Sequence, residues 1–119
     1  SQRPIKTLLL AQNVVAGLGN IYADEALWRA RVRPDRRGGI SLDASKRLHR
    51  SIIDVLAEGI EHGGTTLRDY RDATGSSGSH QQHLDCYGRS GLPCTACGTP
   101  LDFARIDARS TTWCRRCQR

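Results

Sequence analysis

Aromatic side chains are scarce in this sequence: they make up 5% of 119 residues, and there is a single phenylalanine. A chain of this length forms one domain, or two subdomains that share an interface, and here it has little apolar bulk to bury. No run approaches the ~18 apolar residues of a membrane span, and no charged segment followed by an apolar stretch opens the chain. We therefore expect a soluble, cytoplasmic protein with no membrane partner.

Acidic residues are the minority charge. The 12 Asp and Glu are outnumbered by 18 Lys and Arg, which gives a formal net charge of +6. A basic balance favours a polyanionic partner such as nucleic acid, although a surplus of this size does not by itself identify one.

Cysteines are also few, but four of the five form two Cys-x-x-Cys pairs, Cys94 with Cys97 and Cys114 with Cys117. Pairs separated by about 15 to 20 residues offer four thiolates to one Zn²⁺ in tetrahedral geometry. The alternatives are two disulfides or two redox pairs, but nothing nearby resembles the strand-to-helix setting of a thioredoxin motif. Four sulfur ligands leave no position for water, so the predicted zinc is structural rather than catalytic.

The segment between the two pairs predicts a two-stranded β-hairpin. Apolar residues alternate loosely with charged ones over residues 101–107, and Thr111 to Trp113 is rich in β-forming side chains. Arg109 is expected at or near the tip of this hairpin. So small a unit should not fold without its metal. Cys86 is left over and is expected to be a small buried hydrophobe.

The beginning of the chain predicts a short helix. Pro4 suits a first helical turn, and Ile5, Leu8 and Leu9 recur at the spacing of one buried face. Lys6 falls outside that face.

A second helix should follow after a glycine-rich join at residues 14–20. Asn20 is a strong N-cap, so the helix is expected to begin at Ile21, with Asp24 and Glu25 near its positive end. The join has two interpretations. It is a tight corner, or its glycine amides and the helix start form an anion site.

A third, long helix is predicted from a cap at Ser41 or Asp43 to about Glu61. Its apolar stripe follows helical spacing through Leu48, Ile52, Val55, Leu56 and Ile60. The two histidines beside it, His49 and His62, lie off the stripe and are expected in solvent. Two glycines end the helix, and residues 65–70 suggest one further short turn. The fold class is thus mainly α, with about four helices before a small zinc-ribbon hairpin that carries the four paired cysteines.

Residues 72–82 show no apolar periodicity and are rich in Gly, Ser and Gln. A segment of this length inside a compact domain is usually either disordered or functional, and its composition does not distinguish the two.

Three motifs in this order resemble the C-terminal half of formamidopyrimidine-DNA glycosylase, and the resemblance covers essentially the whole chain. They are Lys6 with the segment 17–25, the segment 63–67, and the segment 87–94 with its zinc hairpin. The family includes the endonuclease VIII type glycosylases. The resemblance implies a helix-two-turn-helix bundle over residues 1–71, a lesion-capping loop over 72–83 and a zinc finger over 84–119.

The resemblance also implies which residues bind DNA. It places Asn20 and Lys6 on phosphates beside the damaged nucleotide, extends the DNA-binding role to Gly19 and Tyr22, and assigns Arg109 of the hairpin to the same backbone. An asparagine at a helix start beside glycine amides is a chemically suitable phosphate site. Without the resemblance, Arg109 could equally be a solvated charge; with it, a guanidinium that binds phosphate bidentately is favoured.

The lesion loop implied by the resemblance departs from the usual family pattern. Aromatic residues commonly follow its second glycine, whereas serine and histidine stand here, so recognition of the everted base is expected to differ. The residues concerned are Gly75, Ser76, Ser77, Gly78, Ser79 and His80.

The family's N-terminal catalytic domain, with its proline nucleophile, has no counterpart in these residues. We therefore expect this chain alone to bind DNA weakly and to cleave nothing. In the longer enzyme, the resemblance implies a monomeric, nucleoid-associated glycosylase and AP lyase that removes oxidised purines such as 8-oxoguanine from double-stranded DNA. Two alternatives remain: an endonuclease VIII type enzyme for oxidised pyrimidines, and a non-catalytic zinc-ribbon protein that binds nucleic acid.

Overall fold

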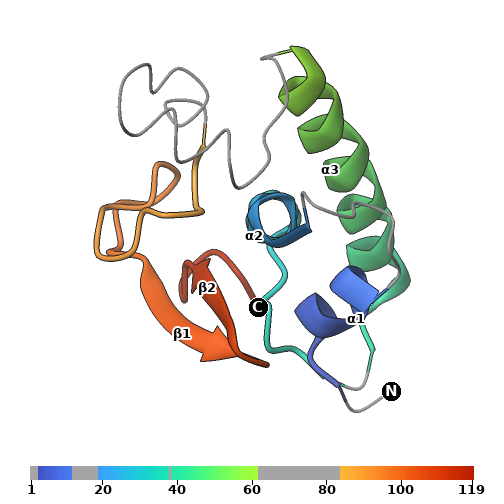
Figure 1. Ribbon diagram of the computed structural model, residues 1–119, viewed down its shortest axis with the longest axis horizontal. Coiled ribbons are helices and arrows are strands. Elements are labelled where there is room, and N and C mark those ends of the chain that lie inside the picture. Colours follow the sequence, from blue (N-terminus) through green and yellow to red (C-terminus); the bar gives the residue numbers. More distant parts are fainter. Residues whose placement is uncertain (1–2, 12–18, 38, 62–83) are drawn as a thin grey trace.

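The computed structural model describes residues 3–11, 19–37, 39–61 and 84–119 (Figure 1). These residues form three helices, α1 (Ile5–Ala11), α2 (Gly19–Ala30) and α3 (Leu42–Glu61), and two strands, β1 (Asp102–Ile106) and β2 (Arg109–Trp113). The mainly α fold class with a small cysteine-rich hairpin is confirmed. A fourth helix is not, since its expected position at 65–70 lies outside the described residues, as do His62 and the predicted lesion loop at 75–80.

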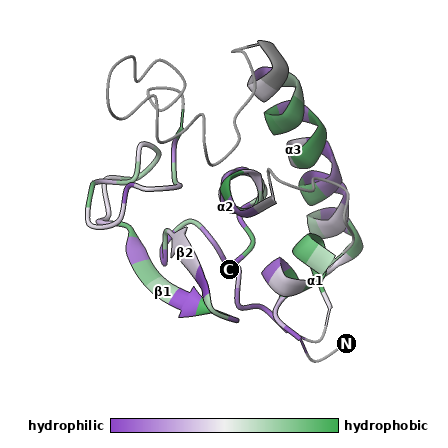
Figure 2. Cartoon of the chain, viewed as in Figure 1, coloured by the Kyte–Doolittle hydropathy of each residue, from purple (hydrophilic) through white to green (hydrophobic). Residues whose placement is uncertain are grey.

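Helix α2 forms the centre of the molecule, with α3 along one side and the hairpin along the other (Figure 1). Its alanines at 26 and 30 are almost fully buried, and such small side chains allow a neighbouring helix to approach closely. Leu27 of α2 packs with Leu48 and Val55 of α3 in one apolar cluster. The predicted stripe on α3 is confirmed for these residues, and hydrophobic and hydrophilic positions alternate along that helix (Figure 2).

The first two helices differ from the sequence prediction in three details. Lys6 is the buried residue of α1, while Ile5 and Leu9 are only partly buried against the core. Helix α2 begins at Gly19 rather than Ile21, so Asp24 and Glu25 lie beyond its first turn. Both acids are buried, because the hairpin packs over Asp24 and the segment 85–87 over Glu25, and no periodicity within α2 could indicate those contacts.

The hairpin is antiparallel, with Asp102 opposite Trp113 and Ile106 opposite Arg109. Its two turn residues, Asp107 and Ala108, have φ of 50° and 64°, the left-handed conformation that a tight hairpin turn requires. Arg109 therefore follows the turn directly, as the sequence predicts. No helix in the described part of the chain is long and apolar enough to span a bilayer.

Candidate metal centre and nucleic-acid interface

The four paired cysteines meet at one point, with all Sγ atoms within 4.8 Å of one another. The Sγ atoms of Cys94 and Cys117 are 3.9 Å apart, and those of Cys97 and Cys114 are 3.5 Å apart. A zinc ion with Zn–S bonds of roughly 2.3 Å in a tetrahedron requires S···S separations of about 3.8 Å. The donor set therefore fits one structural zinc ion.

Hydrogen bonds around the sulfurs suit thiolate ligands. Trp28 of α2 donates its indole N–H to Cys94 Sγ over 3.4 Å, and the backbone N–H of Cys117 donates to Cys114 Sγ over 3.4 Å. Such outer contacts orient metal ligands and stabilise their negative charge. Because one of the donors comes from a helix, the metal centre is attached to the helical part rather than standing apart from it.

Gln118 joins the second cysteine pair to the helical region. Its amide oxygen accepts the N–H of Cys114 over 2.7 Å, and its amide nitrogen donates to the carbonyl of Val32 over 2.9 Å. Gln118 is fully buried, so both contacts are shielded from water.

The open edge of β2, which β1 does not pair, is covered by side chains of α1 and α2. The carbonyl of Ser110 accepts from Lys6 Nζ over 2.8 Å and from Asn20 Nδ2 over 3.2 Å. The N–H of Thr112 donates to Asp24 Oδ2 over 3.1 Å. These bonds satisfy strand groups that would otherwise be buried without partners. Sequence reasoning missed Asp24 here, because the contact joins segments far apart in the chain.

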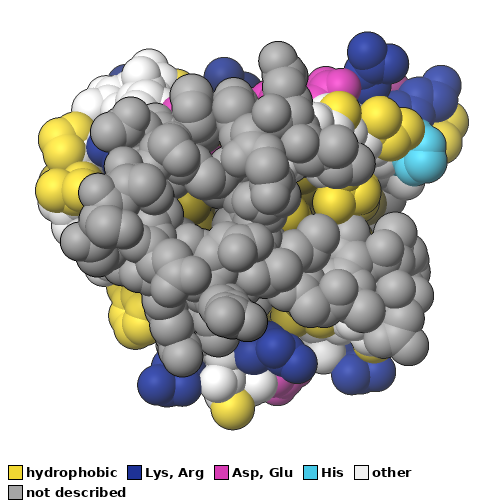
Figure 3. All heavy atoms as spheres, turned by 45° about the horizontal axis from the view of Figure 1, so that its top comes forward, with side chains coloured by type: hydrophobic (Ala, Val, Ile, Leu, Met, Phe, Trp, Pro, Cys, Tyr) yellow, Lys and Arg dark blue, Asp and Glu magenta, His cyan; other side chains and the backbone are white. Residues whose placement is uncertain are grey.

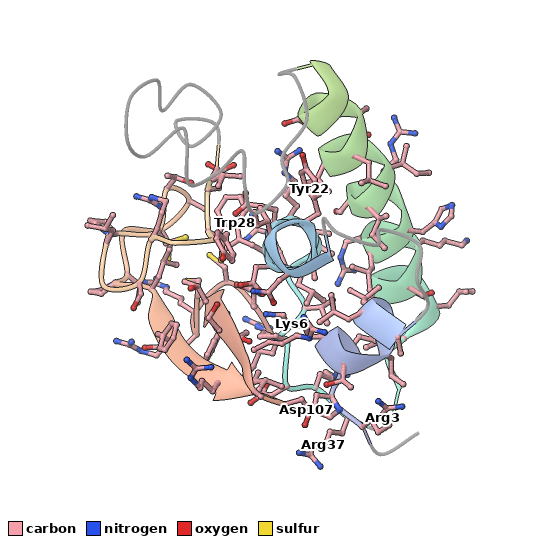
Figure 4. All side chains as sticks on the ribbon, viewed as in Figure 1. Arg3, Lys6, Tyr22, Trp28, Arg37 and Asp107 are labelled. Atoms are coloured by element: carbon pink, nitrogen blue, oxygen red, sulfur yellow. The ribbon has the colours of Figure 1, made fainter. Side chains whose placement is uncertain are left out.

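Lys6 is buried, with 1% of its surface exposed, and lies between α1 and the hairpin (Figure 4). Its Nζ has three partners at 2.8 Å: Asp24 Oδ1, the Ser110 carbonyl and Thr111 Oγ1. Three acceptors match the three protons of an ammonium group. In this structure Lys6 thus supports the strand that carries Arg109, with its ammonium group in the interior.

Burial disfavours the charged forms of both members of this ion pair. It lowers the pKa of Lys6, and it raises the pKa of Asp24 to about 6 despite the neighbouring ammonium. A buried pair of this kind contributes little net stability, but removing one partner would leave the other charge uncompensated.

Glu25 makes the second buried acidic contact with the zinc-binding half. Its Oε1 accepts the N–H of Asp85 over 2.8 Å, and its Oε2 accepts the N–H groups of Cys86 and Tyr87 over 2.7 and 2.6 Å. Burial raises the pKa of Glu25 to about 7, and the three amides oppose that rise. One carboxylate thus fixes three consecutive peptide groups just before the first cysteine pair. Among these residues Cys86 is fully buried, and its thiol donates to the Thr112 carbonyl.

The other predicted DNA-binding residues differ in how far their side chains are buried. Gly19 and Asn20 form the first turn of α2 and are partly buried. Tyr22 is 4% exposed and packs on Gly59 of α3, where an added Cβ would lie 1.8 Å from the tyrosine oxygen. Its side chain is therefore part of the core, whereas Asn20 is partly buried and Arg109 is exposed.

Arg109 is exposed and borders an open pocket of about 160 Å³ between α1 and the hairpin tip. Asp107, labelled in Figure 4, lies on the same pocket and accepts a hydrogen bond from Thr7 of α1. This bond holds the tip against α1. The pocket is lined by Arg3, Thr7, Leu10, Ala11, Asp107 and Arg109.

Comparison with known proteins bears on both parts of the chain. Residues 1–71 match the family model of the formamidopyrimidine-DNA glycosylase H2TH domain, and residues 91–119 match the zinc finger found in FPG and IleRS. A formamidopyrimidine-DNA glycosylase of Desulforamulus reducens is 50% identical over 97% of this chain and 42% of its own length. The chain spans 42 to 43% of the length of this relative and of those from Acidovorax sp. and Herpetosiphon aurantiacus.

Solved structures agree with the sequence comparison. The crystal structure of the Thermus thermophilus MutM (Fpg) protein is 46% identical, with a TM-score of 0.84, over 99% of this chain and 46% of that one. The Lactococcus lactis Fpg (MutM) in complex with DNA containing FAPY-dG is 38% identical, also with a TM-score of 0.84, over 100% of this chain and 43% of that one. With its matching helical region and its zinc finger, the chain belongs to the formamidopyrimidine-DNA glycosylase family, of which it represents the C-terminal part.

Proposed function

We propose that this chain is the DNA-binding part of a base-excision-repair DNA glycosylase and AP lyase that removes oxidised purines from double-stranded DNA. The observation that carries the proposal is the hydrogen bond between Asn20 and Ser110, the residue that directly follows Arg109. Asn20 Nδ2 donates to the Ser110 carbonyl and thereby joins the first turn of α2 to the start of β2. The partly buried Asn20 and the exposed Arg109, on elements far apart in sequence, are thus held near each other.

Such a pair suits a DNA backbone. Amide and guanidinium groups donate to phosphate oxygens, and these contacts set position without reading sequence. Phosphates held beside a lesion would stabilise a bent duplex with an extrahelical base, for which unstacking costs a few kcal/mol. Lys and Arg side chains lie in several groups around the margin of one face of the molecule (Figure 3).

The chemical step belongs to the longer protein. The described residues supply phosphate contacts and a zinc-supported hairpin, and the family nucleophile, an N-terminal proline, is not among the 119 residues. The relatives crystallised with DNA containing 8-oxo-G, an abasic site or FAPY-dG support oxidised purines and their abasic products as the substrate class. The division into 1–71, 72–83 and 84–119, the monomeric state and the cytoplasmic location remain part of this proposal.

The binding test uses the zinc-loaded chain and a fluorescent duplex containing an abasic site analogue, titrated at several salt concentrations. Replacing Arg109 by alanine should weaken binding and reduce the slope of log K against log salt by about one, because one phosphate contact is lost. Arg50→Ala is the matched control, since Arg50 is 78% exposed and lies on α3. An unchanged slope for Arg109→Ala would remove Arg109 from the interface.

The substrate test uses the longer protein in which this chain occurs. Excision of 8-oxoguanine in preference to thymine glycol is expected, and the reverse preference would assign the protein to the endonuclease VIII branch. The isolated chain should form no covalent adduct with abasic DNA in the presence of borohydride. An adduct would show that a nucleophile exists within these residues.

A further inference from the structure

Ser110 lies where the elements that bear Lys6, Asn20 and Arg109 meet. Its carbonyl accepts hydrogen bonds from Lys6 of α1 and Asn20 of α2, and it directly follows Arg109 in β2. Its hydroxyl oxygen also accepts from Asn20 Nδ2, over 3.3 Å. No motif in the sequence singles out this serine; only the folded chain brings it beside the predicted DNA-binding residues.

The Ser110 hydroxyl can still donate one hydrogen bond. A serine hydroxyl offers one donor and two acceptor positions, and here Asn20 occupies an acceptor position. Within residues 3–11, 19–37, 39–61 and 84–119, no acceptor receives the hydroxyl proton. The side chain is only partly buried, so an acceptor that arrives from solvent can reach it.

Several features make a phosphate oxygen the fitting acceptor. The exposed Arg109 is the preceding residue of β2, and the Asn20 amide nitrogen, a donor, stands beside the hydroxyl. The Asp24 carboxylate, which accepts the Thr112 N–H on this edge, is paired with Lys6, so these two charges offset each other. A group that approaches this position therefore meets donors, and an anionic acceptor is favoured over another donor.

We propose that the Ser110 hydroxyl is a further DNA-phosphate ligand, whose oxygen the Asn20 amide orients. This inference rests on the proposed function, since it takes the ligand to be a DNA backbone. Successive side chains of a strand point to opposite faces, so Arg109 and Ser110 reach different phosphates. Arg109 and Ser110 would then contact phosphates of the DNA backbone on opposite faces of β2.

The test compares Ser110→Ala with Arg109→Ala and with their double variant in the zinc-loaded chain, by anisotropy on the abasic duplex. A lost hydrogen bond to a charged group should raise the Kd of Ser110→Ala about tenfold. The salt slope should stay at the wild-type value, because serine carries no charge to replace a counterion. The two effects should multiply in the double variant, since the two phosphates differ. Ser45→Ala, at an exposed position on α3, is the matched control.

A purely structural role predicts a different pattern. If Ser110 only oriented the strand, its removal would also displace Arg109, the salt slope would fall, and the double variant would bind like Arg109→Ala alone. That pattern would overturn the proposal, as would a Kd for Ser110→Ala equal to or below that of the wild type. If Arg109→Ala also binds as the wild type does, the proposed function fails as well; if Arg109→Ala is weakened, only the role of Ser110 is refuted.

Discussion

Replacement of Glu25 by glutamine should loosen the attachment of the zinc-binding half to α2. The carboxylate accepts three backbone N–H groups, two of them on one oxygen. Glutamine offers one oxygen and one NH₂ group. In its best orientation, the oxygen keeps the two hydrogen bonds from the N–H groups of Cys86 and Tyr87. The NH₂ group then faces the N–H of Asp85, and two donors oppose each other.

The magnitude follows from these contacts. A hydrogen bond to a charged group is worth about 1.5 to 3 kcal/mol, and an unsatisfied buried donor costs about 1 to 3 kcal/mol. Relief from burying a carboxylate offsets part of this loss. We expect the free energy of unfolding to fall by about 3 kcal/mol, which is a large share of the roughly 5 to 15 kcal/mol typical of a domain.

The assay is urea unfolding followed by the fluorescence of Trp28 and Trp113, at a fixed concentration of free zinc because bound metal adds to stability. Glu58→Gln is the matched control. Glu58 pairs with Arg29 but its side chain is 42% exposed, so the change should cost less than about 1 kcal/mol. If Glu25→Gln unfolds at the same urea concentration as Glu58→Gln, the three amide contacts do not hold the two halves together.

Three further changes test other parts of the structure. Because burial raises the pKa of Glu25 from 4.5 to about 7, the folded chain retains a proton that the unfolded chain releases, so stability should fall as pH rises across this interval. That fall should be smaller in Glu25→Gln, as measured by urea unfolding at each pH, and what remains comes from Asp24, whose pKa burial raises to about 6. Gly59→Ala should lower the free energy of unfolding by about 2 kcal/mol, because its methyl group would overlap Tyr22; an unchanged urea midpoint would contradict this packing. Lys6→Met should cost about 3 to 5 kcal/mol by leaving Asp24 unpaired, and adding Asp24→Asn should recover part of the loss. Equal midpoints for the single and double variants would argue against the ion pair.

Some elements could be predicted because their determinants are local. The two Cys-x-x-Cys pairs determine a metal site through their spacing, and the structure brings their sulfurs within 4.8 Å. The stripe on α3 and the position of Arg109 next to the hairpin turn likewise depend on residues close together in the chain. Periodicity and turn chemistry carry this information without any tertiary contact.

Other residues were misplaced because their environment is made by distant segments. Lys6 lies off the apolar face of its own helix and would be solvated if α1 stood alone, yet its ammonium group binds the Ser110 carbonyl, 104 positions further along the chain. Asp24 and Glu25 suit a helix N-terminus by charge, but the hairpin and the segment before it bury both. Burial of a charged group is stable only where partners replace water, and those partners exist only once the chain has folded.

The sequence by itself determined the family, the zinc ligands, the long helix and the hairpin, since each depends on residue type and short-range spacing. Only the tertiary structure decided which polar residues support the interface and which remain free to bind. It places Lys6 and Tyr22 in the interior, leaves Asn20 and Ser110 partly buried, and leaves Arg109 exposed. The physical reason is that a side chain's partners are set by the packing of α1, α2 and β2 together, and that packing is not a property of any one segment.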